Sequence, residues 1–450
     1  MGVRQVLRCR SKACGEFRPR WPVRTWGCCL CLVLLAGSGC GRGPSRNVTL
    51  TLVGFGLDAG EALRRDALDE FTHTTGITAD LIPTWGTSAE QLAQTLRLLN
   101  QHASTPDVYV IDVVWPGTLG GHLLDLASYQ DQDAHSHLPE LLTNDTVGGR
   151  LVSLPFYLNV GMLYYRTDLL QKYGYHHPPN TWDELETMAG KIQRGERAAG
   201  NRDFWGYVWQ GAAYEGLTCN ALEWQASFGG GRIIEPDGAI SVNNPRSVQA
   251  LSKAAEWVGT ISPPSVLSYT ESDSLNVFRT GNAAFLRHWS AGLPPRSASD
   301  SPIHERFAVS LLPAGPHGRA QTMGGFHLAV SRYSTHPREA AQLVIYLTGG
   351  QVQLRRALAR GYLPTIPRLY QDQALVEVLP YVEILRNAGA AAWVARPSTV
   401  AGSNYGEVSR QYYQTVHHIL RHETRAQDGL TALEQRLAAC TGLRRGAPQE

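Results

Sequence analysis

The chain has 450 residues, of which 43% are hydrophobic and 18% charged, and its formal net charge is +2. Single hydrophobic cores stop growing at roughly 250–300 residues, so we expect two domains or lobes. A charge so close to balance argues against a nucleic-acid-binding protein, which needs a basic patch.

The first 39 residues have the layout of an export signal. Seven basic residues precede the apolar run Cys28–Ala36, and the small residues 37–39 lead to Cys40. The run is shorter than the ~20 residues of a membrane-spanning helix. We therefore predict a signal peptide over residues 1–39, a lipoprotein linker over residues 40–47 and a lipid anchor on Cys40 that holds the mature chain at a membrane.

Removal of this leader changes both the charge and the cysteine count. Residues 1–39 contain seven of the 41 basic and one of the 39 acidic residues, so the mature chain has 34 basic against 38 acidic residues and a net charge of −4. This balance again predicts no nucleic-acid partner. Only Cys40, Cys219 and Cys440 remain, and a disulfide between the last two stays open in an exported protein.

Strands and helices alternate over the first third of the mature chain. Residues 47–53 and 77–83 alternate as strands, and the β-branched run Asp107–Trp115 is typical of a buried parallel strand. Between the last two, Ser88 and Gln91 form the pattern of a capping box at the start of a helix. This order predicts an α/β lobe.

Further helices are predicted downstream by their caps and apolar spacing. Thr181 with Glu184 caps one helix, Asn244 begins another, and the C-terminal part has two more, with inward positions at Val408, Tyr412, Val416, Ile419, Leu430, Leu433 and Leu437.

The stretch Gln321–Leu347 is predicted to be strand, turn and helix. Met323, Phe326 and the residues after them alternate as in a half-buried strand, and the Gly324-Gly325 pair lets the backbone turn or pass close to a ligand. Ser334 or Thr335 is expected to cap the helix, with Pro337 in its first turn.

No catalytic or metal motif is present. The sequence has no G-x-S-x-G, no H-E-x-x-H and no phosphate loop, and its histidines are scattered, so we expect no metal and no cofactor. Aromatic residues instead lie beside carboxylates and amides at turns. Sugar rings need flat apolar walls and hydrogen-bonding groups around them, which this pattern supplies.

Five segments, in order, carry a resemblance to a known family: LPFYLNVGMLYYRTDLLQKYGYHHPPNTWDEL, FWGYVWQGAAYEGL, GNAAFLRHW, MGGFHLAV and VARPSTV. Together they resemble the family 1 extracellular solute-binding proteins of bacterial ABC sugar importers, most of all the trehalose/maltose-binding branch. The resemblance implies an α/β fold with two lobes, the type II periplasmic-binding-protein fold, and a hinge between discontinuous lobes. We expect an N-terminal lobe of residues 48–152 and 292–346 and a C-terminal lobe of residues 153–291 and 347–445.

The resemblance also implies a set of ligand-binding residues: Glu61, Asp112, Tyr157, Asn159, Tyr214, Trp289, Gly325, Phe326 and Arg396. Asn159 stands where the family has Asp, and Phe326 where it usually has Trp. Structural roles stay open for several of them. Asp112 could be a hydrogen-bond acceptor in the turn after a strand, Tyr157 a core tyrosine, and Arg396 a member of a surface salt bridge.

The expected function is capture of an α-linked disaccharide outside the cytoplasmic membrane by hinge closure, and its delivery to an ABC permease, by a monomer without enzymatic activity. Two alternatives remain. One is a glycoside hydrolase that uses Asp112 with a second carboxylate such as Glu215, since such enzymes need two carboxyl groups roughly 5–10 Å apart. The other is the same fold with a different small solute.

Overall fold

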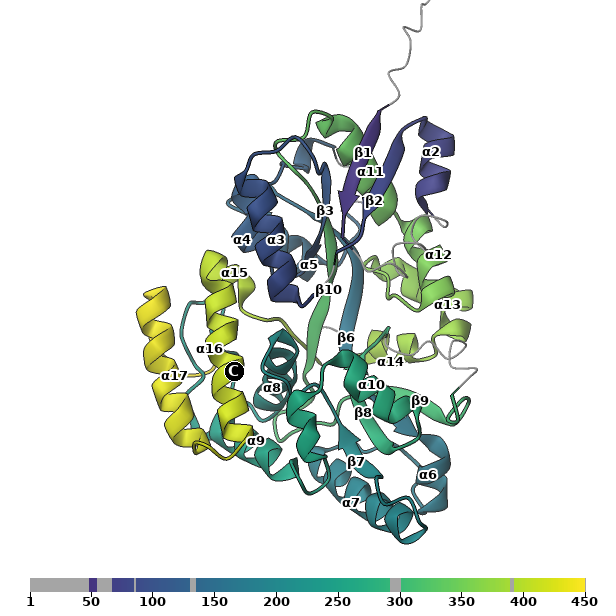
Figure 1. The fold of residues 1–450 in the computed structure, drawn as a ribbon, viewed down its shortest axis with the longest axis vertical. Helices are drawn as coiled ribbons and strands as arrows, with labels where there is room; N and C mark the ends of the chain where they lie inside the picture. The colour runs from purple at the N-terminus through teal and green to yellow at the C-terminus, as the bar shows by residue number, and fades with distance from the viewer. Residues whose placement is uncertain are drawn as a thin grey trace, which may run out of the picture. The chain divides into compact units, whose positions relative to one another are not determined.

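The computed structural model describes residues 48–54, 67–84, 86–129, 135–291, 301–388 and 392–449 (Figure 1). The predicted leader, Cys40 and the candidate ligand residue Glu61 lie outside the described residues.

One mixed sheet runs through the described residues in the strand order β2-β1-β3-β10-β6-β8-β7, with β9 paired to β6 and β11 paired to β10. Its strands are β1 (Thr49–Val53), β2 (Thr78–Ile82), β3 (Val108–Asp112), β6 (Leu154–Arg166), β7 (Trp205–Val208), β8 (Ala283–Trp289), β9 (Phe307–Leu311), β10 (Gln321–Val330) and β11 (Trp393–Val394). A separate hairpin is formed by β4 (Thr146–Val147) and β5 (Arg150–Leu151).

The α-helices are α2 (Asp69–Thr75), α3 (Ser88–Asn100), α4 (Pro116–Leu119), α5 (Pro139–Asn144), α6 (Thr167–Lys172), α7 (Trp182–Ala198), α8 (Glu215–Ser227), α9 (Pro245–Trp257), α10 (Glu271–Arg279), α11 (Pro337–Thr348), α12 (Gly350–Arg360), α13 (Gln373–Val378), α14 (Tyr381–Ala388), α15 (Ser398–Ala401), α16 (Tyr405–Leu420) and α17 (Ala426–Thr441). We call the part built on β1–β3 the β3 side of the sheet, and the part built on β7–β9 the β8 side.

The two long strands β6 and β10 join these two sides. The second half of β10 pairs with β3, whereas the first half of β6 pairs with β10 and its second half with β8 and β9. A hydrophobic cluster on the β3 side includes Leu50, Leu52, Leu154, Leu328 and Leu343, and a larger one continues to the β8 side. The sheet therefore connects two packed regions through two continuous strands.

Residues 301–320, which we assigned to the N-terminal lobe, begin on the β8 side. The backbone of β9 pairs with Met162–Arg166, and the amide of Thr167 donates to the carbonyl of Arg306. The chain then reaches β3 only through β10. The expected lobe boundary between residues 152 and 153 falls just before the start of β6.

Several predicted helix starts are confirmed, and two are corrected. The side chains of Thr181 and Asn244 cap α7 and α9 as expected. The capping box of α3 uses Thr87 and Glu90, one residue before the predicted pair, because Ser88 instead donates to Asp112. Helix α11 has no side-chain cap, because Ser334 is bonded to Asp107.

The strand predictions need two corrections of detail. The run Asp107–Trp115 does contain a buried strand, β3, which is parallel to β1 but antiparallel to β10. Gly324 and Gly325 lie inside the continuous strand β10 rather than in a turn before it.

The disulfide left open between Cys219 and Cys440 is absent, since both thiols are free. Cys219 is buried in α8 and Cys440 lies in α17, and α16 packs against both helices. The two cysteines therefore belong to helices that a third helix holds apart.

These thiols should differ in reactivity. Burial raises the pKa of Cys219 to about 12, so almost none of it is thiolate at pH 8. In native protein lacking residues 1–40, we expect a thiol reagent such as DTNB to modify the partly exposed Cys440, and Cys219 only after denaturant is added. Rapid modification of both thiols in the folded protein would contradict this arrangement.

Candidate functional site: a polar and aromatic strip across the sheet

The strand register places most of the predicted ligand residues on one face of the sheet. Phe326 is paired with Asp112 on one side and with Tyr157 on the other, and Gly324 is paired with Asn159. Gly161, two residues beyond Asn159, is paired with Trp289. Because side chains alternate along a strand, these positions all project from the same face.

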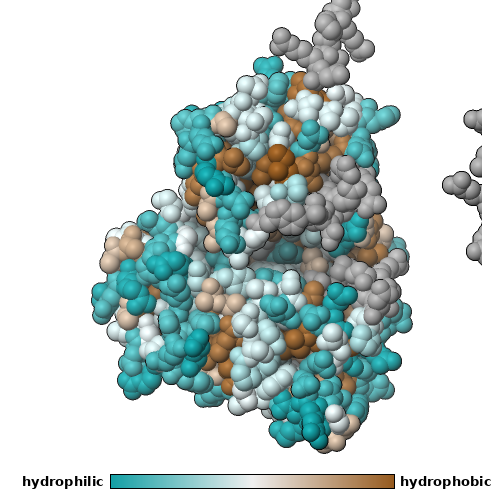
Figure 2. All heavy atoms as spheres, in the orientation of Figure 1, coloured by the Kyte–Doolittle hydropathy of each residue, from teal (hydrophilic) through white to brown (hydrophobic). Residues whose placement is uncertain are grey.

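On this face, the central strands of the otherwise buried sheet are partly exposed to solvent. Within β10 only Phe326 is partly exposed, and in the half of β6 that pairs with β10 only Asn159 is. Figure 2 shows the surface hollowed between the part that carries α3 and the part that carries α8 and α10, in front of β6 and β10. The strip of Asp112, Phe326, Tyr157, Asn159 and Trp289 is therefore a place where a small molecule can meet the sheet.

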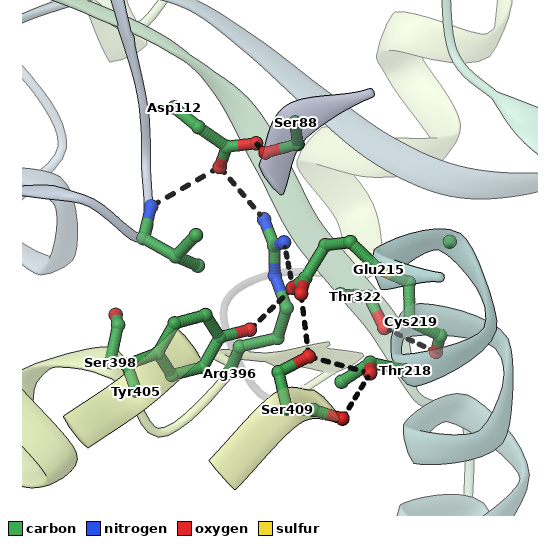
Figure 3. Close-up of polar contacts among 12 residues, drawn as sticks. Ser88, Asp112, Glu215, Thr218, Cys219, Thr322, Arg396, Ser398, Tyr405 and Ser409 are labelled. Atoms are coloured by element: carbon green, nitrogen blue, oxygen red, sulfur yellow. Dashed lines mark hydrogen bonds and ion pairs between the residues drawn. The ribbon is translucent and has the colours of Figure 1, made fainter. Parts of the chain in front are cut away.

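Arg396 joins carboxylates from the two sides of the sheet (Figure 3). Its Nη1 lies 2.6 Å from Oε1 of Glu215 at the start of α8, and its Nη2 lies 3.4 Å from Oδ1 of Asp112 at the end of β3. The guanidinium is buried, and its Nε has no hydrogen-bond partner. Burial opposes its charge, but Cys219, Tyr405 and the two carboxylates outweigh that cost and raise the pKa of Arg396 well above its ordinary value.

Both carboxylates have further partners that hold them in place. The hydroxyl of Ser88 donates to Oδ2 of Asp112 over 3.1 Å, and the amide of Val114 donates to Oδ1 over 3.2 Å. Glu215 accepts hydrogen bonds from the hydroxyls of Tyr405 and Ser409 on α16, the latter over 2.5 Å (Figure 3). Asp112 and Glu215 are thus oriented before any ligand binds.

A second carboxylate arrangement holds the aromatic residues on the β8 side. The hydroxyl of Tyr214 donates to Oε2 of Glu271 over 2.5 Å, and the indole N–H of Trp289 donates to Oε1 over 3.2 Å. Burial, followed by the charge of Glu271, raises the pKa of Tyr214, so its hydroxyl stays protonated. Both rings remain partly exposed.

On the β3 side, three rings form a cluster. The ring centroid of Tyr157 lies 5.6 Å from that of Phe326 and 4.4 Å from that of Tyr362. Burial raises the pKa of Tyr157 well above its ordinary value, and its side chain is largely covered. Phe326 and Tyr362 are the more accessible members, so they present the flat surface here.

Eight of the nine predicted ligand residues lie in one region of the molecule: Asp112, Tyr157, Asn159, Tyr214, Trp289, Gly325, Phe326 and Arg396. The ninth, Glu61, lies outside the described residues. Sequence reasoning missed Glu271, Tyr362, Tyr405 and Ser409, and it named Glu215 only as a hydrolase carboxylate. The one local signal was the position of Glu215 and Glu271 at helix starts, where acidic residues are also common for helix stability.

Gly325 is required by the backbone at this site. Its φ is +125°, and an added Cβ would lie 2.2 Å from the carbonyl oxygen of Tyr157. We expect Gly325→Ala to lower the free energy of unfolding by about 2–4 kcal/mol, from strain and steric overlap together.

The matched control is Gly200→Ala, since Gly200 has a φ of +109° but open space around its Cβ position. It should cost only about 1 kcal/mol of backbone strain in a urea titration. Equal losses for the two variants would show that contact with Tyr157 is unimportant.

The described ranges contain neither a cluster of metal-binding side chains nor a membrane-spanning helix. No three His, Cys, Asp or Glu side chains gather there in a way that could hold a metal ion. No helix in the same part of the chain is both long and apolar enough to cross a membrane.

The fold and this strip define a two-lobed α/β binding protein. Residues 66–378 match the family model described as bacterial extracellular solute-binding protein, and the chain belongs to that family. It is 45% identical over 397 residues to a probable ABC transporter-binding protein of Deinococcus radiodurans, covering 88% of this chain and 94% of the relative.

Solved structures agree with this classification. Maltose-bound T. maritima MalE3 superposes with a TM-score of 0.80 at 33% identity, covering 87% of this chain and 99% of that one. A solute-binding protein of Thermotoga lettingae bound to α-D-tagatose gives a TM-score of 0.78 at 21% identity, covering 88% and 100%. The predicted family and the predicted type of fold are both confirmed.

Proposed function

We propose that this protein captures a neutral sugar, an α-linked disaccharide of the maltose or trehalose type, and presents it to an ABC permease. The observation that carries the proposal is the bridge from Arg396 to Asp112 and Glu215, which lies beside partly exposed aromatic rings. The group holds one guanidinium and two carboxylates, so its formal charge is −1 and it disfavours an anionic solute. A sugar can share their hydrogen bonds without bringing a charge that must be compensated.

The spacing of the aromatic residues supports a ligand with two rings. Phe326 pairs with Tyr157, and Trp289 pairs with Gly161, four residues further along β6. Four residues of a strand span about 13 Å of backbone. The ring of Trp289 reaches across this stretch to Gly324, two residues before Phe326 on β10, so both aromatic surfaces flank one continuous strip along which the two rings of a disaccharide would lie. MalE3, which is similar over nearly its whole length, holds maltose.

Binding would act by closing the two lobes. Asp112 and Phe326 belong to the β3 side, and Glu215 and Trp289 to the β8 side, so a sugar that contacts both groups favours the closed state. The strands β6 and β10 would carry the hinge. We also propose that residues 1–39 direct export and that a lipid on Cys40 anchors a monomer outside the cytoplasmic membrane, where the permease reads closure as its signal.

Thermal unfolding with a panel of solutes tests this proposal. Protein lacking residues 1–40 should gain a few degrees in Tm with maltose or trehalose at 100 times Kd, because ligand binding then adds about 2.7 kcal/mol. Mannitol, ribitol and tagatose belong in the panel as smaller neutral solutes, and glucose 6-phosphate as a charged control. Stabilisation by the phosphorylated sugar alone would contradict a site for neutral ligands.

A further inference from the structure

A fully buried ion pair lies directly behind the candidate site. The side chains of Arg287 on β8 and Glu223 on α8 are both 0% exposed, with Nη2 2.5 Å from Oε1 and Nε 2.9 Å from Oε2. Removing two charges from water is costly, and apolar residues of similar volume often stabilise a core equally well. The pair is therefore poorly explained by stability alone, and its contacts indicate what it positions.

The guanidinium of Arg287 lies against the indole of Trp289. Its central carbon is 4.3 Å from the ring centroid, and its Nη1 donates to Oε1 of Gln210 over 3.1 Å. A planar guanidinium that is held by a carboxylate on one edge can stack on an aromatic face. Because Glu271 also holds the indole N–H, the ring is restrained both by a stacked cation and at its edge.

Glu223 connects the same pair to the backbone of the site. Its Oε1 accepts the amide N–H of Thr322, three residues before Gly325 on β10. Gly161, the strand partner of Trp289, leaves room for it, because a Cβ there would lie 2.0 Å from Oε1 of Glu223. One carboxylate thus joins α8, β8 and β10, which carry Glu215, Trp289 and Gly325.

We propose that Arg287 is a positioning residue for sugar capture: held by Glu223, it fixes the ring of Trp289 in the orientation that receives a sugar face. This inference rests on the proposed function, since it assigns the ring as a ligand surface. Arg287 itself has no exposed atoms and does not touch the ligand. We expect its effect on affinity to pass through Trp289, the partly exposed ring on which it stacks.

A double-mutant cycle tests this role. Arg287→Lys keeps a cation for Glu223 but removes the planar stacked group, and it should raise the Kd for maltose about threefold to tenfold. In a Trp289→Leu background the same change should raise Kd by less than a factor of two, because the ring it positions is gone. Equal factors in the two backgrounds, or no change in either, would overturn the proposal.

Two further measurements keep the test valid if Arg287→Lys does not fold or if the protein binds no sugar. If Arg287→Lys does not fold, Glu223→Gln/Arg287→Met removes both charges together, leaves no unpaired ion and should show the same dependence on Trp289. Acrylamide quenching of Trp289, taken as the difference between protein with and without that residue, needs no sugar and should increase in Arg287→Lys. Unchanged quenching contradicts the positioning role, whereas increased quenching without binding of any sugar contradicts only the proposed function.

Discussion

Replacement of Trp289 by alanine should weaken sugar binding roughly 10- to 100-fold, the loss typical of an aromatic residue at the centre of a binding surface. The ring is partly exposed at the end of β8, and its N–H is held by Glu271. The free energy of unfolding should change little by comparison. Calorimetric titration gives the change in Kd, and urea unfolding gives the change in stability.

Trp205 provides a matched control for this variant. It is also a partly exposed tryptophan on a strand of the same sheet, and the guanidinium of Arg197 lies 4.2 Å from its ring centroid. It lies on the edge strand β7 and pairs with Ala283, at the opposite end of β8 from Trp289. Trp205→Ala should leave the Kd unchanged, and an equal loss in both variants would remove Trp289 as a specific contact.

Replacement of Arg396 by alanine should both abolish measurable sugar binding and lower the free energy of unfolding by about 3 kcal/mol. Asp112 and Glu215 would lose their shared cation while their side chains remain only 12% and 18% exposed. Removing one member of a buried ion pair is costly because it leaves charge without compensation. Titration with maltose and urea unfolding measure the two effects separately.

Arg410 is the control for the loss of a guanidinium as such. It pairs with Glu407 one helical turn away on α16, with both side chains more than 40% exposed. Such surface pairs contribute about 0.5 kcal/mol or less. If Arg410→Ala were as harmful as Arg396→Ala, the bridge between Asp112 and Glu215 would have no special role.

The sequence was sufficient to predict four strands, β1, β2, β3 and β10, and six of the helices, α3, α7, α9, α11, α16 and α17. Through the resemblance it also predicted the family and the type of fold. Local patterns failed where two similar signals competed. Thr87 with Glu90 and Ser88 with Gln91 both fit a capping box, and the charged Glu90 forms it, consistent with the positive end of a helix dipole. Apolar spacing could not show that Ser334 would bond to Asp107 instead of capping α11.

The site was predictable only in part because its members meet through tertiary structure. The resemblance implies Asp112, Trp289 and Arg396 one by one, from their positions along the chain. Glu215 and Tyr405 are 190 residues apart and come together only through the packing of α8 on α16. No local pattern in the chain encodes that contact.

The most direct test of sugar capture is calorimetric titration of protein lacking residues 1–40 with maltose, followed by analysis of the recovered sugar. We predict one saturable site per chain with a Kd in the micromolar range or below, which needs only about −8 kcal/mol of binding free energy. The disaccharide should be recovered intact. Absence of binding to maltose and trehalose, or steady release of glucose from either, would contradict a receptor that binds a neutral disaccharide and releases it chemically unchanged.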